Sequence, residues 1–239
     1  MSYIDTPFRE YAAGTQPDND SPAYKSTILR HPTRKLVKIP QTVTELSGPR
    51  FSAVRFPPTD NLAVNGGKDA QGERIIVEGR VLDEDGRAVP HTMVEIWQAN
   101  AAGRYNHARD QHDAPLDPEF SGIGRVFTDE TGAYRFISIK PGAYPWGNHA
   151  NAWRPNHIHF SLFGPGYATR LITQMYFPGD PLLALDPIFL ATADAGARER
   201  LVSTFDLEIT QPNWALGYRF DIVLRGRQAT PMEDGDDHS

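Results

Sequence analysis

The sequence contains no cysteine among its 239 residues. Disulfide bonds, cysteine-ligated zinc and iron–sulfur clusters are therefore excluded. It also lacks an apolar run long enough to cross a membrane, and residues 1–7 show no apolar core of signal-peptide length. From these absences we expect a cytoplasmic protein.

The chain carries fewer positively charged residues than negatively charged ones. The chain has 24 Lys and Arg residues against 30 Asp and Glu residues, which gives a formal net charge of −6. No dense basic tract is present either, so a nucleic-acid partner is disfavoured. An anionic substrate would have to be attracted by a local cluster of groups or by another chain.

Residues 1–70 are rich in Pro, Asp and Asn and show little periodicity. Such a composition offers too little apolar surface for the segment to fold alone. We expect it to be an N-terminal extension that wraps over the domain or over a partner chain, although residues 1–20 could equally be a flexible tail. A short strand is predicted at 36–39, and Gly66-Gly67 predicts a break.

Strand patterns dominate from residue 71 to residue 228. The apolar alternation predicts strands at 75–82, 92–99, 125–128, 133–138, 157–163, 169–176 and 218–224. The glycine-containing turn at 129–132 predicts that 125–128 and 133–138 form a hairpin. At least six short strands separated by turns predict an all-β fold, an antiparallel β-sandwich.

Two shorter segments complete the prediction. One short helix is expected from about 193 to 202, although Gly196 weakens it. Residues 229–239 are acidic, and we expect them to form a disordered tail.

Two histidines, His157 and His159, form the most informative motif. Side chains alternate along a strand, so both imidazoles share one face while Ile158 points to the other. Neighbouring imidazoles make half of a metal site, although a histidine in a strand is more often an ordinary hydrogen-bonded residue. Tyr105 and Tyr144 lie upstream, and phenolate oxygens favour Fe(III) over zinc.

Several ordered motifs, spread over most of the chain, resemble the intradiol ring-cleavage dioxygenases. The similarity is strongest to the two-subunit enzymes of that family that act on protocatechuate. It implies a β-sandwich enzyme that cleaves protocatechuate with O2 to 3-carboxy-cis,cis-muconate, in the β-ketoadipate pathway of aromatic catabolism. The motifs are Ser21-Pro-Ala-Tyr24, Gly103-Arg-Tyr105, Pro141-Gly-Ala-Tyr144-Pro-Trp146, Trp153-Arg154-Pro-Asn-His157-Ile-His159, Leu171-Ile-Thr-Gln174 and Tyr218-Arg-Phe-Asp-Ile-Val-Leu-Arg225.

The resemblance assigns roles to individual residues. It implies that one non-haem Fe(III) per chain is held by four ligands: Tyr105, Tyr144, His157 and His159. Tyr144 is implied to leave the metal when the substrate binds, which makes it catalytic as well. Arg154 cannot bind a metal, because guanidinium has no lone pair to donate. Its implied role is to stabilise negative charge on the ring, with Gln174 hydrogen-bonded beside it.

The resemblance also implies a substrate pocket and a partner. Trp146 and Ile188 would form walls against an aromatic ring, and Tyr24 would meet the substrate carboxylate. As alternatives, Trp146 and Ile188 could be core residues and Gln174 an ordinary strand amide. A homologous, iron-free α subunit would complete the pocket in an α/β hetero-oligomer. The remaining histidines are interpreted as non-ligands: His31, His91, His107, His112, His149 and His238.

Two other functions compete with this interpretation. A catechol or hydroxyquinol 1,2-dioxygenase of the same family would carry a helical N-terminal domain, whereas residues 1–70 have no helical period and many prolines. A non-catalytic β-sandwich subunit would lack the tyrosine or histidine ligands, and all four are present in the sequence.

Overall fold

A computed structural model describes residues 11–34, 53–54, 56–163 and 170–233. The strand predicted at 36–39 lies outside these residues. Within them, no helix is long and apolar enough to span a membrane.

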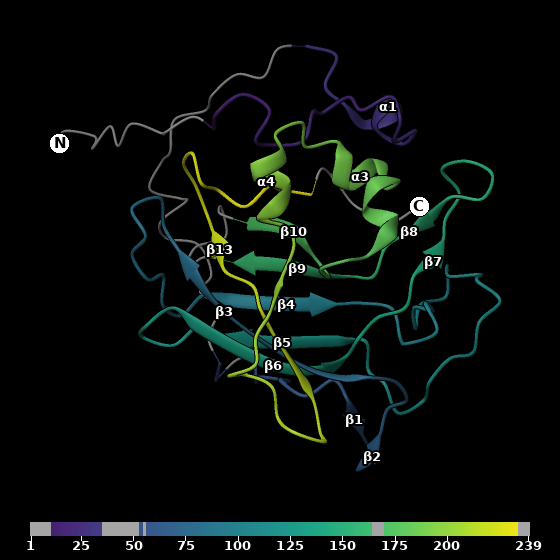
Figure 1. The fold of residues 1–239 in the computed structure, drawn as a ribbon, viewed down its shortest axis with the longest axis vertical. Coiled ribbons are helices and arrows are strands. Elements are labelled where there is room, and N and C mark those ends of the chain that lie inside the picture. The colour runs from purple at the N-terminus through teal and green to yellow at the C-terminus, as the bar shows by residue number, and fades with distance from the viewer. Residues whose placement is uncertain (1–10, 35–52, 55, 164–169, 234–239) are drawn as a thin grey trace.

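Four antiparallel strands form the first sheet, in the order β10–β9–β4–β5 (Figure 1). They are β4 (Met93–Trp97), β5 (Ile123–Phe127), β9 (His157–Phe163) and β10 (Arg170–Tyr176). Each lies where apolar alternation predicted a strand. One of the two inner strands, β9, is buried on both faces along nearly its whole length, which places the His-x-His motif inside the molecule.

The second sheet is built around β3 (Arg74–Leu82). Strand β6 (Ala133–Ile139) pairs with it in antiparallel fashion. Strands β12 (Leu216–Arg219) and β13 (Ile222–Val223) pair with it in parallel. A short strand, β11 (Thr204–Phe205), is antiparallel to β12. The single strand predicted at 218–224 is therefore divided into two short ones.

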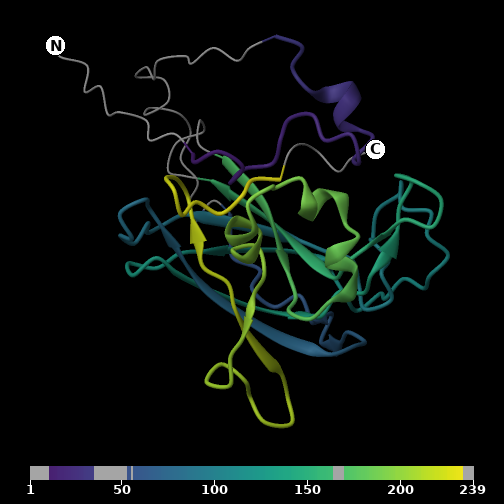
Figure 2. The ribbon, with the colours of Figure 1, turned by 45° about the horizontal axis from the view of Figure 1, so that its top comes forward.

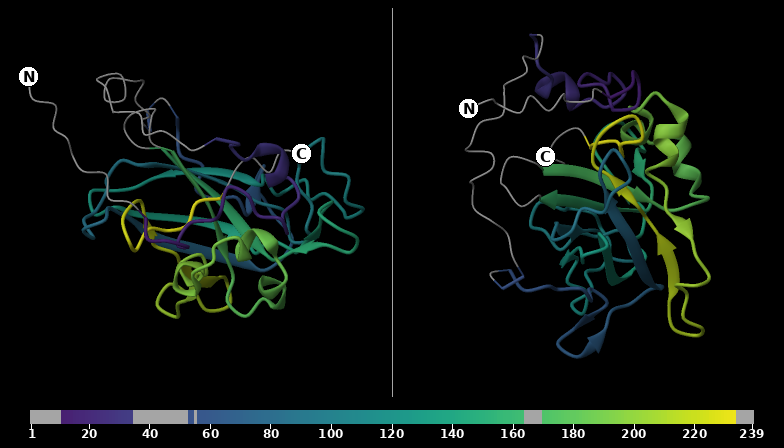
Figure 3. Two further views of the ribbon diagram at one scale, coloured as in Figure 1. Left: turned by 90° about the horizontal axis from the view of Figure 1, so that it is seen from above. Right: turned by 90° about the vertical axis from the view of Figure 1, so that its left-hand side faces the viewer.

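The two sheets pack face to face as a β-sandwich, which confirms the predicted fold class (Figure 3). Alternate residues of β9, namely Ile158, Phe160 and Leu162, point into the core between the sheets. They meet Val77 of β3 and Phe136 of β6, both of which are fully buried. The two histidines of β9 consequently face outward from this core.

The predicted hairpin at 125–138 is wrong. Strand β5 pairs with β4 in the first sheet, whereas β6 pairs with β3 in the second. The turn at 129–132 is tight, with the N–H of Gly132 bonded to the carbonyl of Asp129, but it carries the chain from one sheet to the other. Local turn chemistry is the same in both arrangements, so the sequence signal could not separate them.

Short elements surround the sandwich. Gly66-Gly67 does not end a segment but forms the turn between β1 (Val64–Asn65) and β2 (Lys68–Asp69), since both glycines have positive φ angles of 57° and 82°. Strands β7 (Tyr144–Pro145) and β8 (Trp153–Arg154) form a small ladder. The helical elements are α1 (Thr27–Arg30), η1 (Pro181–Ala184), α3 (Pro187–Leu190) and α4 (Ala195–Glu199). The last lies inside the predicted helix at 193–202 but is shorter.

Residues 11–34 pass over the side of the domain that carries α3 and α4 (Figure 2). The carbonyl of Gly14 accepts a hydrogen bond from the N–H of Asp194 at 2.9 Å. Asn148 binds the same segment twice, through the carbonyl of Ala23 at 2.7 Å and the N–H of Lys25 at 2.9 Å. These contacts bring residues near the start of the chain beside the β7–β8 ladder.

Residues 229–233 also differ from expectation. We expected a disordered tail from residue 229, yet Ala229 and Thr230 are buried, and the chain runs beside β10. Thr173 donates to the carbonyl of Pro231 at 2.7 Å, and the N–H of Glu233 donates to the carbonyl of Ile172 at 2.8 Å. The segment therefore reaches the face of the first sheet that carries the histidines.

Candidate active site and metal centre

The outer face of the first sheet gathers polar and aromatic side chains in a row. His159 lies between Trp97 on β4 and Gln174 on β10 in the strand register. Cross-strand partners share one face of a sheet, so the three side chains are neighbours. The Trp97 ring stacks on the His159 ring with centroids 4.8 Å apart and planes 5° apart. Two residues along β9, on the same face, His157 pairs with Tyr176.

Tyr105 is brought to this face by a tight loop. The side chain of Asn100 accepts hydrogen bonds from the N–H groups of Ala102 at 2.9 Å and Arg104 at 3.0 Å. Gly103 has a φ of +76°, and a Cβ there would lie 2.1 Å from the carbonyl oxygen of Ala143. Glycine is therefore needed where this loop packs against the residue before Tyr144.

The β7–β8 ladder holds the second tyrosine beside the arginine, because Tyr144 pairs directly with Arg154. Arg154 precedes a proline, which restricts it to the extended backbone that a strand requires. The carbonyl of Pro155 accepts from Nδ1 of His157 at 2.6 Å. One short segment thus fixes Tyr144, Arg154 and His157 together.

The four predicted ligands converge. Their donor atoms form a chain in which Oη of Tyr144 lies 3.5 Å from Nε2 of His157. Nε2 of His157 lies 3.2 Å from Nε2 of His159, which lies 3.1 Å from Oη of Tyr105. Bonds of about 2.0–2.2 Å from one ion to N and O ligands give donor separations of this order.

The histidine tautomers direct both Nε2 lone pairs toward the position enclosed by the four donor atoms. Nδ1 of His157 donates to Pro155, and Nδ1 of His159 lies 3.1 Å from a carboxylate oxygen of Glu233. Burial, followed by the charge of Arg154 and then by His159, lowers the pKa of His157 well below its ordinary value, so its ring is neutral at pH 7. Two lone pairs 3.2 Å apart in a buried site repel unless a cation or a proton lies between them.

A metal ion fits this donor set. Within the described ranges, no group of three or more His, Cys, Asp or Glu side chains has the arrangement of a metal site. The tyrosine oxygens, 3.1 Å and 3.5 Å from the two Nε2 atoms, would complete a donor set for an ion at the histidine pair, and an imidazole–phenolate set suits a ferric ion. Glu233 completes a carboxylate–histidine pair of the kind that orients metal ligands.

A cavity of about 930 Å³ opens over the donors. Tyr24, Tyr105, Tyr144, Trp146 and His159 all lie on its wall. The rings of Tyr24 and Trp146 are 5.4 Å apart and form one aromatic side. The volume lies within the range of ligand sites and exceeds what a single aromatic ring needs.

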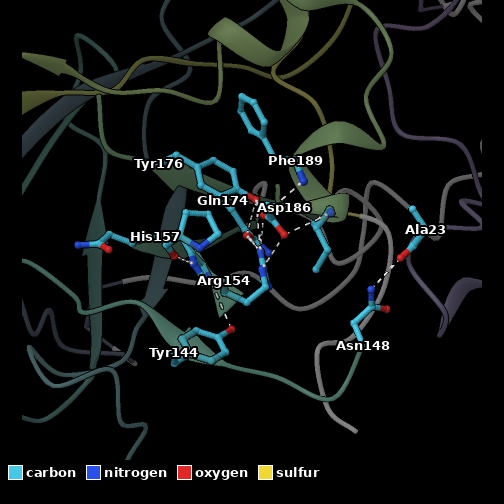
Figure 4. A network of polar contacts seen from close by, with 12 residues as sticks. Ala23, Tyr144, Asn148, Arg154, His157, Gln174, Tyr176, Asp186 and Phe189 are labelled. Carbon is cyan, nitrogen blue, oxygen red and sulfur yellow. Dashed lines mark hydrogen bonds and ion pairs between the residues drawn. The ribbon is translucent and has the colours of Figure 1, made fainter. Parts of the chain in front are cut away.

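Arg154 belongs to a buried network behind the donors (Figure 4). Its Nη2 donates to Oε1 of Gln174 at 2.5 Å, and its Nε lies 3.1 Å from Oδ1 of Asp186. Tyr176 donates to the same Gln174 oxygen at 2.8 Å. Burial, and secondly the charge of Asp186, raises the pKa of Tyr176 well above its ordinary value, so this residue remains a neutral phenol that can donate.

Four predicted site residues lie off the large cavity. Among the described residues, Arg154, His157, Gln174 and Ile188 are absent from its wall. Arg154 is fully buried and carries its guanidinium 5.4 Å from the ring centroid of Trp146. Gln174 and Ile188 instead line a separate small cavity of about 10 Å³. Ile188 is thus placed near Gln174 rather than among the aromatic walls.

The histidines interpreted as non-ligands lie apart from the four donors or on the rim. His107 and His112 line the large cavity. The others make local contacts: His31 with the carbonyl of Thr27, His91 with Glu130 and His149 with the carbonyl of Ala150. His238 lies outside the described residues.

Sequence reasoning missed four residues of the site. Trp97 and Tyr176 carried a usable signal, since strand alternation places both on the histidine face. Asp186 precedes a proline as a helix cap does, but nothing in the sequence links it to Arg154. Glu233 lay in a segment that we expected to be disordered.

Comparisons with known proteins identify related families and chains. Residues 46–226 match the family model described as Dioxygenase, and residues 9–42 match the model described as protocatechuate 3,4-dioxygenase beta subunit N terminal. The chain is 60% identical over 215 residues to the protocatechuate 3,4-dioxygenase beta chain of Burkholderia cepacia, covering 89% of this chain and 91% of that one.

More distant similarities extend the comparison. The protocatechuate 3,4-dioxygenase alpha chain of Pseudomonas putida is 29% identical, over 82% of this chain and 97% of its own length. The solved structure of hydroxyquinol 1,2-dioxygenase from Pseudomonas putida DLL-E4 aligns with a TM-score of 0.57 at 22% identity, over 87% of this chain and 73% of that one. At that identity the match supports the fold alone.

Proposed function

The chain belongs to the family of intradiol ring-cleavage dioxygenases, and we propose that it catalyses cleavage of protocatechuate by dioxygen to 3-carboxy-cis,cis-muconate. Membership of the family implies a non-haem iron. We further propose that one Fe(III) per chain is held by Tyr105, Tyr144, His157 and His159.

One observation carries the metal assignment. Two buried imidazoles present their Nε2 atoms to each other at 3.2 Å, and each is flanked by a tyrosine oxygen, at 3.1 Å and 3.5 Å. Nδ1 of each ring is engaged by another acceptor, so the lone pairs have no other direction in which to point. A metal cation at this position would accept both lone pairs, and the large cavity gives a catechol access to it.

The chain's own residues supply binding, orientation and proton transfer. The bound ferric ion would act as a Lewis acid that holds both catechol oxygens and activates the ring toward dioxygen. Oη of Tyr144 would accept one catechol proton. Trp146 would lie against the ring, and Tyr24 would donate to the substrate carboxylate from the same wall.

Arg154 is the proposed source of positive charge for the reacting ring. Its guanidinium stays protonated, so it can stabilise negative charge that develops on the substrate. It donates to Oε1 of Gln174 at 2.5 Å, a contact present without substrate. Fixed, water-excluded charges are more effective than mobile ones, because no reorganisation is needed during the reaction.

We also propose that the chain works in an α/β hetero-oligomer. The Burkholderia relative is named a beta chain, and the Pseudomonas relative an alpha chain. The cavity is larger than one substrate ring requires, which leaves room for residues of a homologous, iron-free α subunit. The extension formed by residues 1–70 would contribute to that interface, together with the sandwich at 71–228.

Oxygen uptake tests the proposal. The chain, co-expressed with its α partner, should consume one O2 per protocatechuate and much less with catechol or hydroxyquinol. Chelation of iron should abolish uptake, and Fe re-addition should restore it. A preference for catechol or hydroxyquinol would support the competing 1,2-dioxygenase function instead. Uptake that survives complete removal of iron would refute the metal assignment.

A further inference from the structure

Asp186 is a buried carboxylate to which neither the family motifs nor the sequence assigned a role. We propose that Asp186 is a positioning residue for catalysis, which holds the Arg154 guanidinium in the orientation that the reaction uses. The proposal rests on the proposed function, since it concerns the residue that would stabilise charge on the ring.

The two residues are in close contact and are shielded from solvent. Both side chains have 0% relative exposure, and Nε of Arg154 lies 3.1 Å from Oδ1 of Asp186. Nη2 of Arg154 lies 3.4 Å from Oδ2, so the carboxylate meets two nitrogens of the same planar group. Nε makes no hydrogen bond here, so the ion pair at Nε and the single bond from Nη2 together limit where the guanidinium can lie.

Asp186 also lies at the start of α3, which offers a purely structural explanation for its presence. Its carboxylate accepts from the N–H groups of Ile188 and Phe189, but both distances are 3.4 Å. The comparable caps are much shorter, at 2.7 Å for Asp194 on α4 and 2.9 Å for Asp180 on η1. The Asp186 carboxylate therefore lies closer to Arg154 than to the helix end.

The rest of the network extends from this pair. Tyr176 donates toward Oδ2 of Asp186 at 3.3 Å and to Oε1 of Gln174 at 2.8 Å, while Arg154 donates to that same Gln174 oxygen (Figure 4). Asp186 and Gln174 thus contact the guanidinium from two elements. The face of Trp146 lies 5.4 Å from the guanidinium carbon.

Without the Asp186 carboxylate, the buried Arg154 guanidinium would be destabilised in its present position. Removing one partner of a buried pair leaves an uncompensated charge, which drives the side chain to rotate or draws water inward. Either change would displace the positive charge from the reacting ring while leaving the four metal ligands in place. The predicted consequence is slower turnover at unchanged iron content.

Asp186→Asn tests this inference, because asparagine caps helices as well as aspartate but carries no charge. We expect kcat to fall by about tenfold or more, less than the 10²–10³-fold cost of deleting an oxyanion donor outright. Iron content and the visible absorption of the resting enzyme should match wild type. The matched control, Asp194→Asn at the cap of α4, should leave kcat unchanged.

A double-variant cycle separates positioning from structure. If Asp186 acts through Arg154, then Asp186→Asn should cost kcat little in an Arg154→Gln background. If Asp186→Asn alone does not fold, the double variant should fold, because it buries neither charge. Failure of both variants to fold would establish a structural role and overturn the proposal. A wild-type kcat in Asp186→Asn, or equal losses in both backgrounds, would also overturn it. Failure of the proposed function would show separately, as absent oxygen uptake in the wild type.

Discussion

Replacement of Glu233 with glutamine should weaken iron binding without unfolding the protein. A carboxylate oxygen of Glu233 lies 3.1 Å from Nδ1 of His159, and the two side chains are 5% and 1% exposed. The carboxylate accepts a hydrogen bond from Nδ1–H of His159 and so keeps the Nε2 lone pair directed at the metal position. A glutamine amide can point its NH₂ group at Nδ1, which would favour the opposite tautomer.

The expected loss of iron affinity follows from the role of Glu233 as a hydrogen-bond partner of a metal ligand. Loss of such a partner typically lowers metal affinity by about 10–100-fold, which corresponds to about 1.4–2.7 kcal/mol of binding free energy. The change is isosteric, and Glu233 is anchored independently by its backbone bond to Ile172. We therefore expect the midpoint of thermal unfolding of the metal-free protein to stay within a few degrees of wild type.

A chelator competition assay measures the effect. Iron-loaded protein is titrated with a chelator of known affinity, and the fraction of iron retained is followed by its visible absorption. The surface pair His91–Glu130 provides the control, since Glu130 lies 3.2 Å from its histidine but is 82% exposed. Glu130→Gln should retain iron like the wild type. Equal retention by Glu233→Gln would refute the reasoning.

Three further predictions follow from the local geometry. Gly103→Ala places an alanine in a left-handed backbone conformation with its Cβ against the Ala143 carbonyl. The backbone conformation alone costs about 1–2 kcal/mol of folding free energy. Differential scanning calorimetry should therefore show a Tm lowered by at least about 2–4 °C, and the iron content should also fall. The Tyr134 hydroxyl is buried and donates to the Phe220 carbonyl, and burial raises its pKa well above the ordinary value. Above about pH 10 the unfolded chain therefore loses the Tyr134 proton, whereas the folded chain retains it. Stability should then fall by up to about 1.4 kcal/mol per pH unit, and denaturant titrations of Tyr134→Phe should lack this part of the decline. Arg154→Ser should lower kcat by about 10²-fold or more while iron content, measured by elemental analysis, stays near wild type; full activity in that variant would remove its proposed role.

The strands of the sandwich were predictable because one buried face imposes a period of two on the sequence. Strand β9 illustrates this, since Ile158 and Phe160 had to enter the core and His157 and His159 therefore had to face outward. The same alternation placed Gln174 and Tyr176 on the histidine face of β10.

Pairing partners were not predictable in the same way. The turn at 129–132 connects β5 and β6 in different sheets, and its Gly132 serves either arrangement. Nor did any local pattern indicate that β12 and β13 run parallel to β3, because strand direction depends on the path of the whole chain.

Within the site, the sequence indicated the ligand types but not the groups that orient them. Tyr105, Tyr144 and the two histidines belong to recognisable motifs, and their convergence follows from packed loops. Glu233 and Asp186 act on residues 74 and 32 positions away, so only the folded chain brings them into contact. Long-range placement of this kind leaves no periodic trace in the sequence.

Iron stoichiometry combined with visible spectroscopy tests the central claim most directly. Purified protein should contain one iron per chain and show a broad charge-transfer band from tyrosine oxygen to Fe(III). The band should change in Tyr105→Phe and Tyr144→Phe, and iron should be lost in His157→Ala. Correctly folded wild-type protein that binds no iron, or binds it equally well without His157, would contradict the account.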